Sequence, residues 1–283
     1  MVLSRVRLPY FDEILQRAAA DPSSDLVQAF GTRHVHWGYY DEPGAADDST
    51  TGLAAAAEAL TARLVEMAGM RDGLSVLDAG CGFGGTTAYL NERFSGAELT
   101  GLNIDPRQLA RARERVRPQR GNSVSFVEGD ACAMPLPDRH FDVVLAVECI
   151  FHFPGRRRFF NEARRVLKMG GRLVLSDFVP HGPSLPRLSV DLARRAGRIG
   201  AFYGQFNWFP PCTLAGYRWL ARATGLRLVG HEDITRNTLP TYPAFLRILR
   251  GIGHEDAVTA TEYIAEISRR GWVRYMELAF EAI

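Results

Sequence analysis

Three side chains that can hold or move a proton follow two apolar segments of the sequence. Glu148 and His152 lie four positions apart, directly after the run Phe141–Val147, and Asp177 follows the run Arg172–Ser176. Histidine has an ordinary pKa of about 6.5, so it can accept a proton near neutral pH. A positioned general base of this kind contributes roughly 10²–10⁴ in rate. These side chains are therefore candidates for a site of proton transfer.

A second feature with chemical meaning is the glycine-rich turn Val76–Gly85, which leads from an apolar segment into a helical pattern. Glycine lets the backbone turn sharply and approach a ligand closely, and the following helix offers unpaired N–H groups. Gly80, Gly82 and Gly85 also satisfy the G-x-G-x-x-G pattern of dinucleotide-binding folds. The turn predicts a bound polar ligand, and it leaves a nicotinamide cofactor open.

Residues at the ends of the second and third predicted strands narrow the choice of cofactor. An acidic residue at the end of the second strand would hold a ribose hydroxyl, but this sequence has Asn103 there, which accepts a hydrogen bond without a charge. Asp130 ends the third apolar segment and is suited to accept a hydrogen bond from an adenine amino group. Ala131 leaves space for the ring. The order of these residues carries more information than any one of them.

Short apolar strands alternate with helical patterns from residue 75 onward, and this alternation must position the side chains above. It predicts an α/β fold with a mostly parallel sheet and helices on both faces. The predicted strands are Ser75–Ala79, Glu98–Ile104, Ser123–Glu128, Phe141–Val147, Arg172–Ser176, Leu226–Asp233 and Val273–Phe280. The predicted helices are Tyr10–Arg17, Thr51–Met70, Thr86–Arg93, Pro106–Val116, Arg156–Val166, Leu188–Arg198, Leu214–Ala223 and a helical insert at Tyr242–Arg270. Parallel strands bring their carboxyl ends to one edge, where ligands bind.

Composition limits the remaining classes. The chain has 283 residues, of which 46% are hydrophobic and 23% charged, and a formal net charge of +2. This balance is ordinary for a soluble globular protein and gives no general case for nucleic acid or membrane binding. The four cysteines lie far apart without zinc spacing, and the first residues lack the order of a signal peptide. We expect a soluble cytoplasmic protein with reduced thiols and no metal site.

The ordered series of motifs resembles the class I S-adenosylmethionine-dependent small-molecule methyltransferases. The matching segments are V-L-D-A-G-C-G-F-G-G at 76–85, L-T-G-L-N-I-D-P-R-Q-L at 99–109, G-D-A-x-x-M-P-L-P at 129–137, F-D-V-V at 141–144 and L-K-M-G-G-R-L-V-L at 167–175. The resemblance covers most of the chain and is weakest at 180–212 and 240–270. It implies S-adenosyl-L-methionine as the cofactor, S-adenosyl-L-homocysteine as the product, and a Rossmann-like sheet whose last strand is antiparallel.

The same resemblance assigns residues to the cofactor. Gly80 and Gly82 would face its methionine part, Asn103 and Gln108 its ribose, and Asp130 with Ala131 its adenine. The segment His34–Tyr40 resembles a lid, which would bring Tyr39 or Tyr40 near the sulfonium. The full set expected at the cofactor is Tyr39, Tyr40, Asp78, Gly80, Cys81, Gly82, Asn103, Ile104, Gln108, Asp130, Ala131, Val147 and His152.

The E-x-x-x-H arrangement at Glu148–His152 resembles that of sugar and macrolide O-methyltransferases. It implies His152 as the general base, with Asp177 orienting it or contacting the acceptor. Glu148 would organise the cofactor's amino group or neighbouring backbone. The aromatic cluster Phe202–Phe209 would contact an apolar acceptor in the cap, or form the cap's own small core.

The expected organisation has four parts. Residues 1–74 form N-terminal helices and the cofactor lid, and residues 75–179 form the cofactor-binding core. Residues 180–212 form a cap insertion, and residues 213–283 return to the core with a second helical insertion at about 240–270. The oligomeric state stays open, with a homodimer as one option.

The leading hypothesis is methylation of a hydroxyl on an apolar small molecule, such as a polyketide or glycoside. A second keeps the cofactor but places the methyl group on carbon or nitrogen of a prenyl, sterol-like or amine acceptor. In that case Arg187, Arg194, Arg195 and Arg198 would be the place to seek a diphosphate contact. A nicotinamide oxidoreductase and a non-catalytic cofactor-binding protein are the more distant alternatives.

Overall fold

A single seven-stranded sheet forms the centre of the computed structural model, which describes residues 8–204 and 212–283. The strand order is β3-β2-β1-β4-β5-β7-β6. The first five strands are parallel, whereas β7 pairs antiparallel with both β5 and β6. The strands are β1 Ser75–Ala79, β2 Glu98–Asn103, β3 Ser123–Glu128, β4 Phe141–Val147, β5 Leu167–Pro180, β6 Leu226–Asp233 and β7 Val273–Ala282. The predicted α/β fold with an antiparallel last strand is confirmed.

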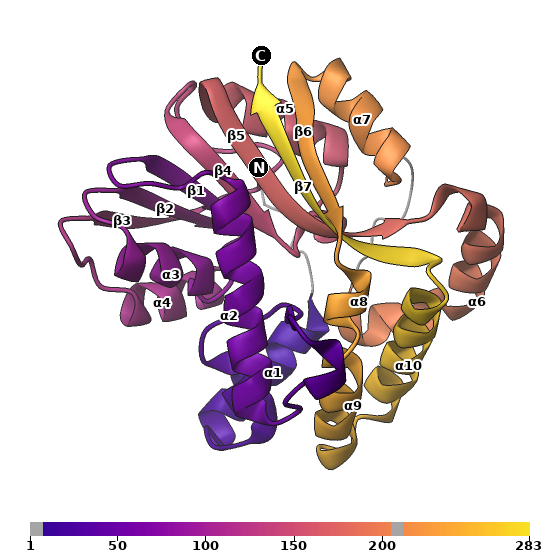
Figure 1. Cartoon of the computed structure of the whole chain (residues 1–283). Helices are drawn as coiled ribbons and strands as arrows, with labels where there is room; N and C mark the ends of the chain where they lie inside the picture. Colours follow the sequence, from indigo (N-terminus) through magenta and orange to yellow (C-terminus); the bar gives the residue numbers. More distant parts are fainter. Residues whose placement is uncertain (1–7, 205–211) are drawn as a thin grey trace.

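Helices cover both faces of this sheet and extend beyond its carboxyl edge (Figure 1). They are α1 Pro9–Ala20, α2 Thr50–Met67, α3 Gly85–Arg93, α4 Pro106–Arg115, α5 Arg156–Val166, α6 Leu185–Tyr203, α7 Leu214–Ala223, α8 Thr235–Thr238, α9 Thr241–Gly251 and α10 Glu255–Arg269. On one face, Leu60 and Leu64 of α2 are fully buried against the sheet. On the other face, Phe159 of α5 and Tyr217 of α7 are fully buried. Each such side chain contributes about 1.5–3 kcal/mol to stability.

The element boundaries follow from identifiable local causes. Asp105 caps α4 by accepting a hydrogen bond from the backbone N–H of Arg107, and Pro106 fills the first turn. Ser49 caps α2, because its side chain accepts a hydrogen bond from the backbone N–H of Gly52.

Strand β5 and helix α6 are markedly longer than predicted. Strand β5 runs on to Pro180 because β7 pairs with it from Arg172 to Pro180. Helix α6 extends over Leu185–Tyr203 because its far end packs against α10. The single helical insert predicted at 242–270 is two helices, α9 and α10, since Gly253 adopts a positive φ of 71° between them.

Four helices gather beyond the carboxyl ends of the parallel strands. Helices α1, α6, α9 and α10 lie together below the sheet in Figure 1, with α6 packed on α10 and on α1. This layer is the helical cap that the sequence predicts. None of the helices in the described part of the chain is long and apolar enough to cross a membrane.

Candidate active site

The glycine-rich turn connects the end of β1 to the start of α3 and requires glycine at two positions for different reasons. Gly80 has a φ of 82°, and a Cβ there would lie 2.9 Å from Cys149 Sγ. At Gly85 a Cβ would lie 2.5 Å from the carbonyl oxygen of Arg33 and 2.6 Å from His34 Nδ1. The turn therefore depends on glycine both for its conformation and for the close approach of the N-terminal segment.

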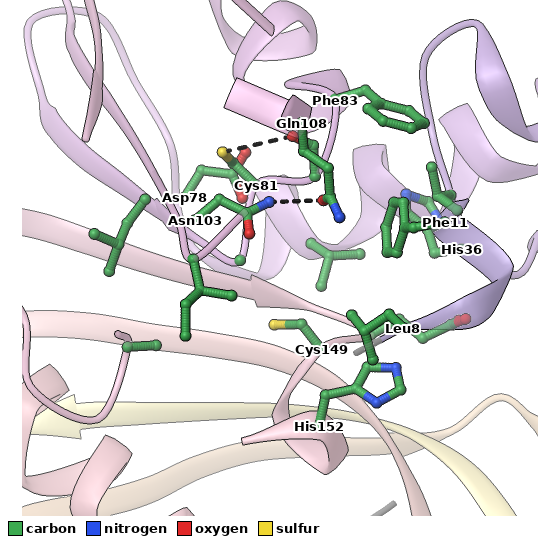
Figure 2. Close-up of a pocket in the computed structure, with 18 of the residues that line it drawn as sticks. Leu8, Phe11, His36, Asp78, Cys81, Phe83, Asn103, Gln108, Cys149 and His152 are labelled. Atoms are coloured by element: carbon green, nitrogen blue, oxygen red, sulfur yellow. Dashed lines mark hydrogen bonds between the residues drawn. The ribbon is translucent and has the colours of Figure 1, made fainter. Parts of the chain in front are cut away.

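A cavity with an empty volume of about 900 Å³ opens beside this turn, at the carboxyl ends of β1 to β4 (Figure 2). Eleven of the thirteen residues expected at the cofactor line it, and they come from four separate stretches of sequence. They are Asp78, Gly80, Cys81, Gly82, Asn103, Ile104, Gln108, Asp130, Ala131, Val147 and His152. Gly80, Gly82 and Gly85 bring no side chain to the turn's side of the cavity, whereas Cys81 and Phe83 of the same turn line it.

The polar groups of this cavity are held in place by their own hydrogen bonds. Asn103 Nδ2 donates to Gln108 Oε1 at 2.8 Å, so these two amides form one unit, as Figure 2 shows. Asp78 accepts a hydrogen bond from Thr87 Oγ1 at 2.9 Å, and burial raises the pKa of Asp78 to about 6. Asp130 Oδ1 accepts from the backbone N–H of the second residue after it. The wall is thus pre-organised by hydrogen bonds.

The expectation for Tyr39 and Tyr40 is wrong, because neither residue lines the cavity. The ring of Tyr39 lies under the guanidinium of Arg63, 4.2 Å from ring centroid to Cζ. The backbone N–H of Tyr40 donates to Asn237 O at 3.0 Å. The cause is Gly38, which packs directly on helix α2 and carries the following two residues away from the sheet edge.

Helix α1 supplies the aromatic wall that Tyr39 and Tyr40 were expected to supply. Tyr10 and Phe11 line the cavity, together with Phe83 of the glycine turn. The rings of Phe11 and Phe83 meet edge-to-face with centroids 5.4 Å apart. Helix α1 was predicted, but no role was predicted for Tyr10 or Phe11. The only signal was an aromatic pair at the start of an amphipathic helix, which also fits ordinary packing.

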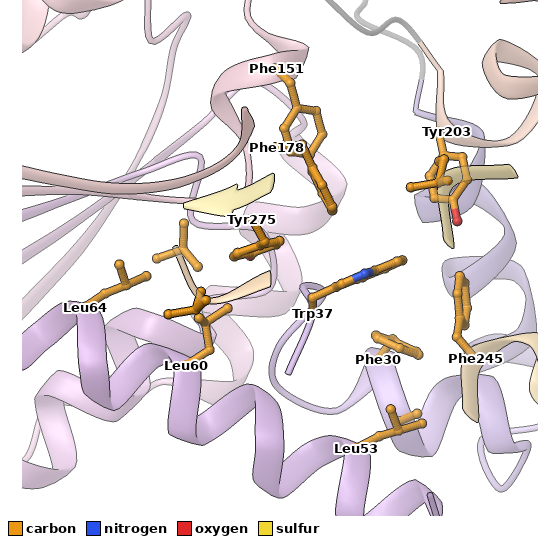
Figure 3. Close-up of a cluster of buried hydrophobic side chains, with 14 of the residues drawn as sticks. Phe30, Trp37, Leu53, Leu60, Leu64, Phe151, Phe178, Tyr203, Phe245 and Tyr275 are labelled. Atoms are coloured by element: carbon orange, nitrogen blue, oxygen red, sulfur yellow. The ribbon is translucent and has the colours of Figure 1, made fainter. Parts of the chain in front are cut away.

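A second, mostly apolar chamber adjoins the first, with an empty volume of about 660 Å³. Eight aromatic side chains line it, and Figure 3 shows several of them converging. They are Tyr10, Phe30, Trp37, Phe151, Phe178, Phe202, Tyr203 and Phe245. Of the predicted aromatic cluster Phe202–Phe209, residues Phe206, Trp208 and Phe209 lie outside the described residues.

His152 stands at the junction of the two spaces. It belongs to the short 3₁₀ turn Ile150–His152 after β4, and it lines both the cavity and the chamber. Its Nε2 lies 3.2 Å from the hydroxyl oxygen of Tyr10, and the two rings stack with centroids 5.8 Å apart. Its position therefore permits contact with a molecule in either space.

Glu148 also lines both spaces, but its carboxyl group is already bonded. Its Oε2 accepts from the backbone N–H of Trp37 at 2.9 Å and from the hydroxyl of Tyr275. Burial raises the pKa of Glu148 to about 8, so the group carries a proton near neutral pH. Glu148 thus joins the N-terminal segment to β4 and β7, and its φ of 49° marks a left-handed backbone at this corner.

The expectation for Asp177 is wrong, because its carboxylate faces away from His152. It accepts from Arg156 Nη2 at 3.0 Å and from the hydroxyl of Tyr217, and none of it is exposed. Successive side chains of a strand point to opposite faces. In β5 the neighbour Phe178 points into the chamber, so Asp177 points to the face that α5 and α7 cover. Burial raises its pKa, although Arg156 opposes that shift.

Comparison with known proteins gives consistent matches. Residues 77–175 match a family described as a methyltransferase domain. The chain is 35% identical to methyltransferase GfsG of Streptomyces halstedii, over 80% of this chain and 77% of that protein. It is 34% identical to 27-O-demethylrifamycin SV methyltransferase of Amycolatopsis mediterranei, over 78% of this chain and 77% of that protein. Further relatives at 30% identity are named as O- and N-methyltransferases.

A solved structure shows the same fold over nearly the whole chain. Geranyl diphosphate C-methyltransferase from Streptomyces coelicolor, in complex with Mg²⁺, geranyl diphosphate and S-adenosyl-L-homocysteine, superposes with a TM-score of 0.73. The match has 21% sequence identity and covers 98% of this chain and 99% of that one.

Proposed function

The chain belongs to the class I S-adenosylmethionine-dependent small-molecule methyltransferases, and from that premise we propose that it methylates a hydroxyl group of an apolar secondary metabolite. One observation carries this proposal: His152 lies where the large polar-lined cavity meets the aromatic chamber. A base at that junction can take the proton of a hydroxyl group entering from the chamber.

S-adenosyl-L-methionine is the cofactor, and it supplies a methyl group bonded to a positively charged sulfur. We assign the glycine turn at Gly80 and Gly82 to its methionine part, and the bonded pair Asn103 and Gln108 to its ribose. Asp130 at the end of β3 would accept from the adenine amino group. Two features of the cavity support this assignment: its glycine turn, and its acceptor groups spaced along four strand ends.

In the proposed reaction the protein acts mainly by alignment and by exclusion of water. The aromatic walls hold the acceptor in a chamber that opens toward the cavity at Tyr10, Val35, Glu148 and His152. His152 holds the hydroxyl proton as the oxygen–carbon bond forms. This contribution of a positioned base amounts to roughly 10²–10⁴ in rate.

The chamber favours a neutral acceptor over a diphosphate. No lysine or arginine is among the described residues that line it. Two of the arginines considered for a diphosphate are engaged elsewhere: Arg187 lies over the ring of Trp272, and Arg195 over the ring of Tyr263. An amine is the second candidate acceptor, since aromatic faces attract a cationic group.

The test begins by incubating the protein with S-adenosylmethionine and candidate metabolites, followed by mass spectrometry of the products. Methylation on oxygen supports the proposal, and methylation on nitrogen or carbon overturns it. His152→Ala is expected to keep cofactor affinity in calorimetry and lose roughly 10²–10⁴ in turnover. The matched control is His231→Ala, because His231 contacts Arg218 on the exposed β6 side. Near wild-type turnover of His152→Ala would remove His152 as the base.

A further inference from the structure

Tyr10 occupies the position that the acceptor hydroxyl would need in order to reach His152 directly. Its hydroxyl oxygen lies 3.2 Å from His152 Nε2, and its side chain lines both the cavity and the chamber. On this basis we propose that Tyr10 is a second catalytic residue, whose hydroxyl contacts the acceptor hydroxyl and passes the proton on to His152. This inference rests on the proposed O-methylation.

The relay requires the hydrogen bond to run from Tyr10 to His152. Burial raises the pKa of Tyr10, and the nearby Glu148 raises it further, so the phenol keeps its proton and can donate it. In the tautomer of His152 that leaves Nε2 unprotonated, the phenol donates and Nε2 accepts. In that tautomer, which the relay requires, Tyr10 already engages the lone pair of Nε2. The phenol oxygen retains lone pairs that can accept a second hydrogen bond from a group in the chamber.

Packing opposes movement of Tyr10 out of this position. Its ring contacts Phe11, with centroids 4.5 Å apart, and both Phe202 and Tyr203, with centroids 6.4 Å apart. One residue beyond this aromatic pair, Asp12 of α1 forms an ion pair with Arg107 of α4 at 2.8 Å. A hydroxyl group that is fixed in this way can relay a proton without any rearrangement of the helix.

The relay balances as one concerted step. The acceptor O–H bond breaks, and its proton moves to the oxygen of Tyr10. The proton of Tyr10 moves to His152 Nε2, which becomes an imidazolium. The acceptor oxygen forms a bond to the methyl carbon while the carbon–sulfur bond breaks, with its electron pair remaining on sulfur. Tyr10 is neutral before and after the step, and His152 later releases the proton to water.

The decisive variant is Tyr10→Phe, which keeps the ring and removes only the hydroxyl group. The relay predicts a loss in kcat of at least about 10², with KM and cofactor affinity close to wild type. Tyr39→Phe is the matched control, because Tyr39 lines neither space, and it should keep wild-type kcat. If Tyr10 instead moves aside to let the acceptor reach His152, Tyr10→Phe keeps or raises kcat, and the relay is overturned.

Two further readouts separate a relay from a merely structural role. A proton inventory in mixed H₂O and D₂O should be bowed for the wild type, with two protons in flight, and linear for Tyr10→Phe. Nitrogen-15 NMR of the acceptor-free protein should show a change in the His152 Nε2 signal in Tyr10→Phe, since that nitrogen loses its donor. An unchanged Nε2 signal or an unchanged inventory contradicts the relay.

The outcome for His152→Ala shows which proposal has failed. If His152→Ala loses turnover while Tyr10→Phe does not, O-methylation with His152 as base stands and the relay is wrong. If both variants keep wild-type turnover, His152 is not the base and the relay fails with it, whereas a product methylated on nitrogen or carbon overturns the proposed O-methylation itself. A fluorinated analogue of that acceptor, with a more acidic hydroxyl, should recover much of the lost rate in both variants only if proton removal is their shared defect.

Discussion

The buried group formed by Asp177, Arg156 and Tyr217 makes a prediction that separates stability from catalysis. Asp177→Asn keeps the shape of the side chain but removes the buried negative charge that pairs with the guanidinium of Arg156. The side chains of Arg156 and Asp177 are 2% and 0% exposed. Breaking such a pair costs about 3–5 kcal/mol. At 2–4 °C per kcal/mol, Tm should fall by roughly 6–20 °C.

The assay combines urea denaturation with turnover measured well below the lowered Tm. We expect Asp177→Asn to shift the midpoint strongly while turnover per folded molecule stays close to wild type. Asp138→Asn is the matched control, because the Asp138 side chain in its ion pair with Arg165 is 70% exposed, and such a pair is worth only about 0.2–1 kcal/mol. A variant with a wild-type midpoint and turnover reduced by about 10² or more would refute this reasoning and return Asp177 to the reaction.

Two other substitutions test the surroundings of the site. The pKa of Glu148 is about 8 in the folded chain and about 4.3 in the unfolded chain. Between about pH 4.3 and pH 8 the folded chain therefore holds a proton that the unfolded chain has lost. The free energy of unfolding of the wild type should therefore fall as pH rises through this window, by up to about 1.4 kcal/mol per pH unit. Denaturation curves at pH 5 and pH 8 should show a smaller fall in the free energy of unfolding for Glu148→Gln than for the wild type. Gly85→Ala places a Cβ 2.5 Å from the carbonyl oxygen of Arg33. At a cost of about 1–3 kcal/mol, it should weaken cofactor binding in calorimetry by roughly 5- to 150-fold. Gly44→Ala, with open space around it, should bind like wild type, and equal affinities for the two alanine variants would contradict the steric argument.

Most of the fold could be predicted because each strand of the core carries its own signal. Strands β1 and β4 have the predicted bounds, since near-continuous apolar runs between breakers are typical of buried parallel strands. The partly exposed edge strands β3 and β6 also have the predicted bounds. The extent of β5 could not be predicted from its own residues. It depends on pairing with β7, about a hundred positions later in the chain, and no local pattern encodes that pairing.

The cofactor residues were predictable for the same reason, since the turn after β1 and the ends of β2 and β3 bear the recognisable motifs. The errors at Tyr39, Tyr40 and Asp177 have two physical causes. The positions of Tyr39 and Tyr40 depend on the contact between Gly38 and helix α2, which joins separate segments of the chain. The direction of the Asp177 side chain depends on which residues of β5 face each side of the sheet. Because both faces of this strand are buried, its apolar run does not show which side chains point to which helical layer.

The acceptor is hard to predict because the residues that would select it lie almost entirely outside the family motif. The match to a methyltransferase domain covers residues 77–175, and only three chamber residues, Glu148, Phe151 and His152, fall within that range. The remaining walls come from the N-terminal 40 residues, the end of β5, and helices α6, α9 and α10. Relatives that share the motif can therefore share a cofactor while they methylate oxygen, nitrogen or carbon. The sequence match within the core supports the assignment of the cofactor. The acceptor must be argued from the shape and chemistry of the chamber, where the aromatic wall meets the pair of Tyr10 and His152.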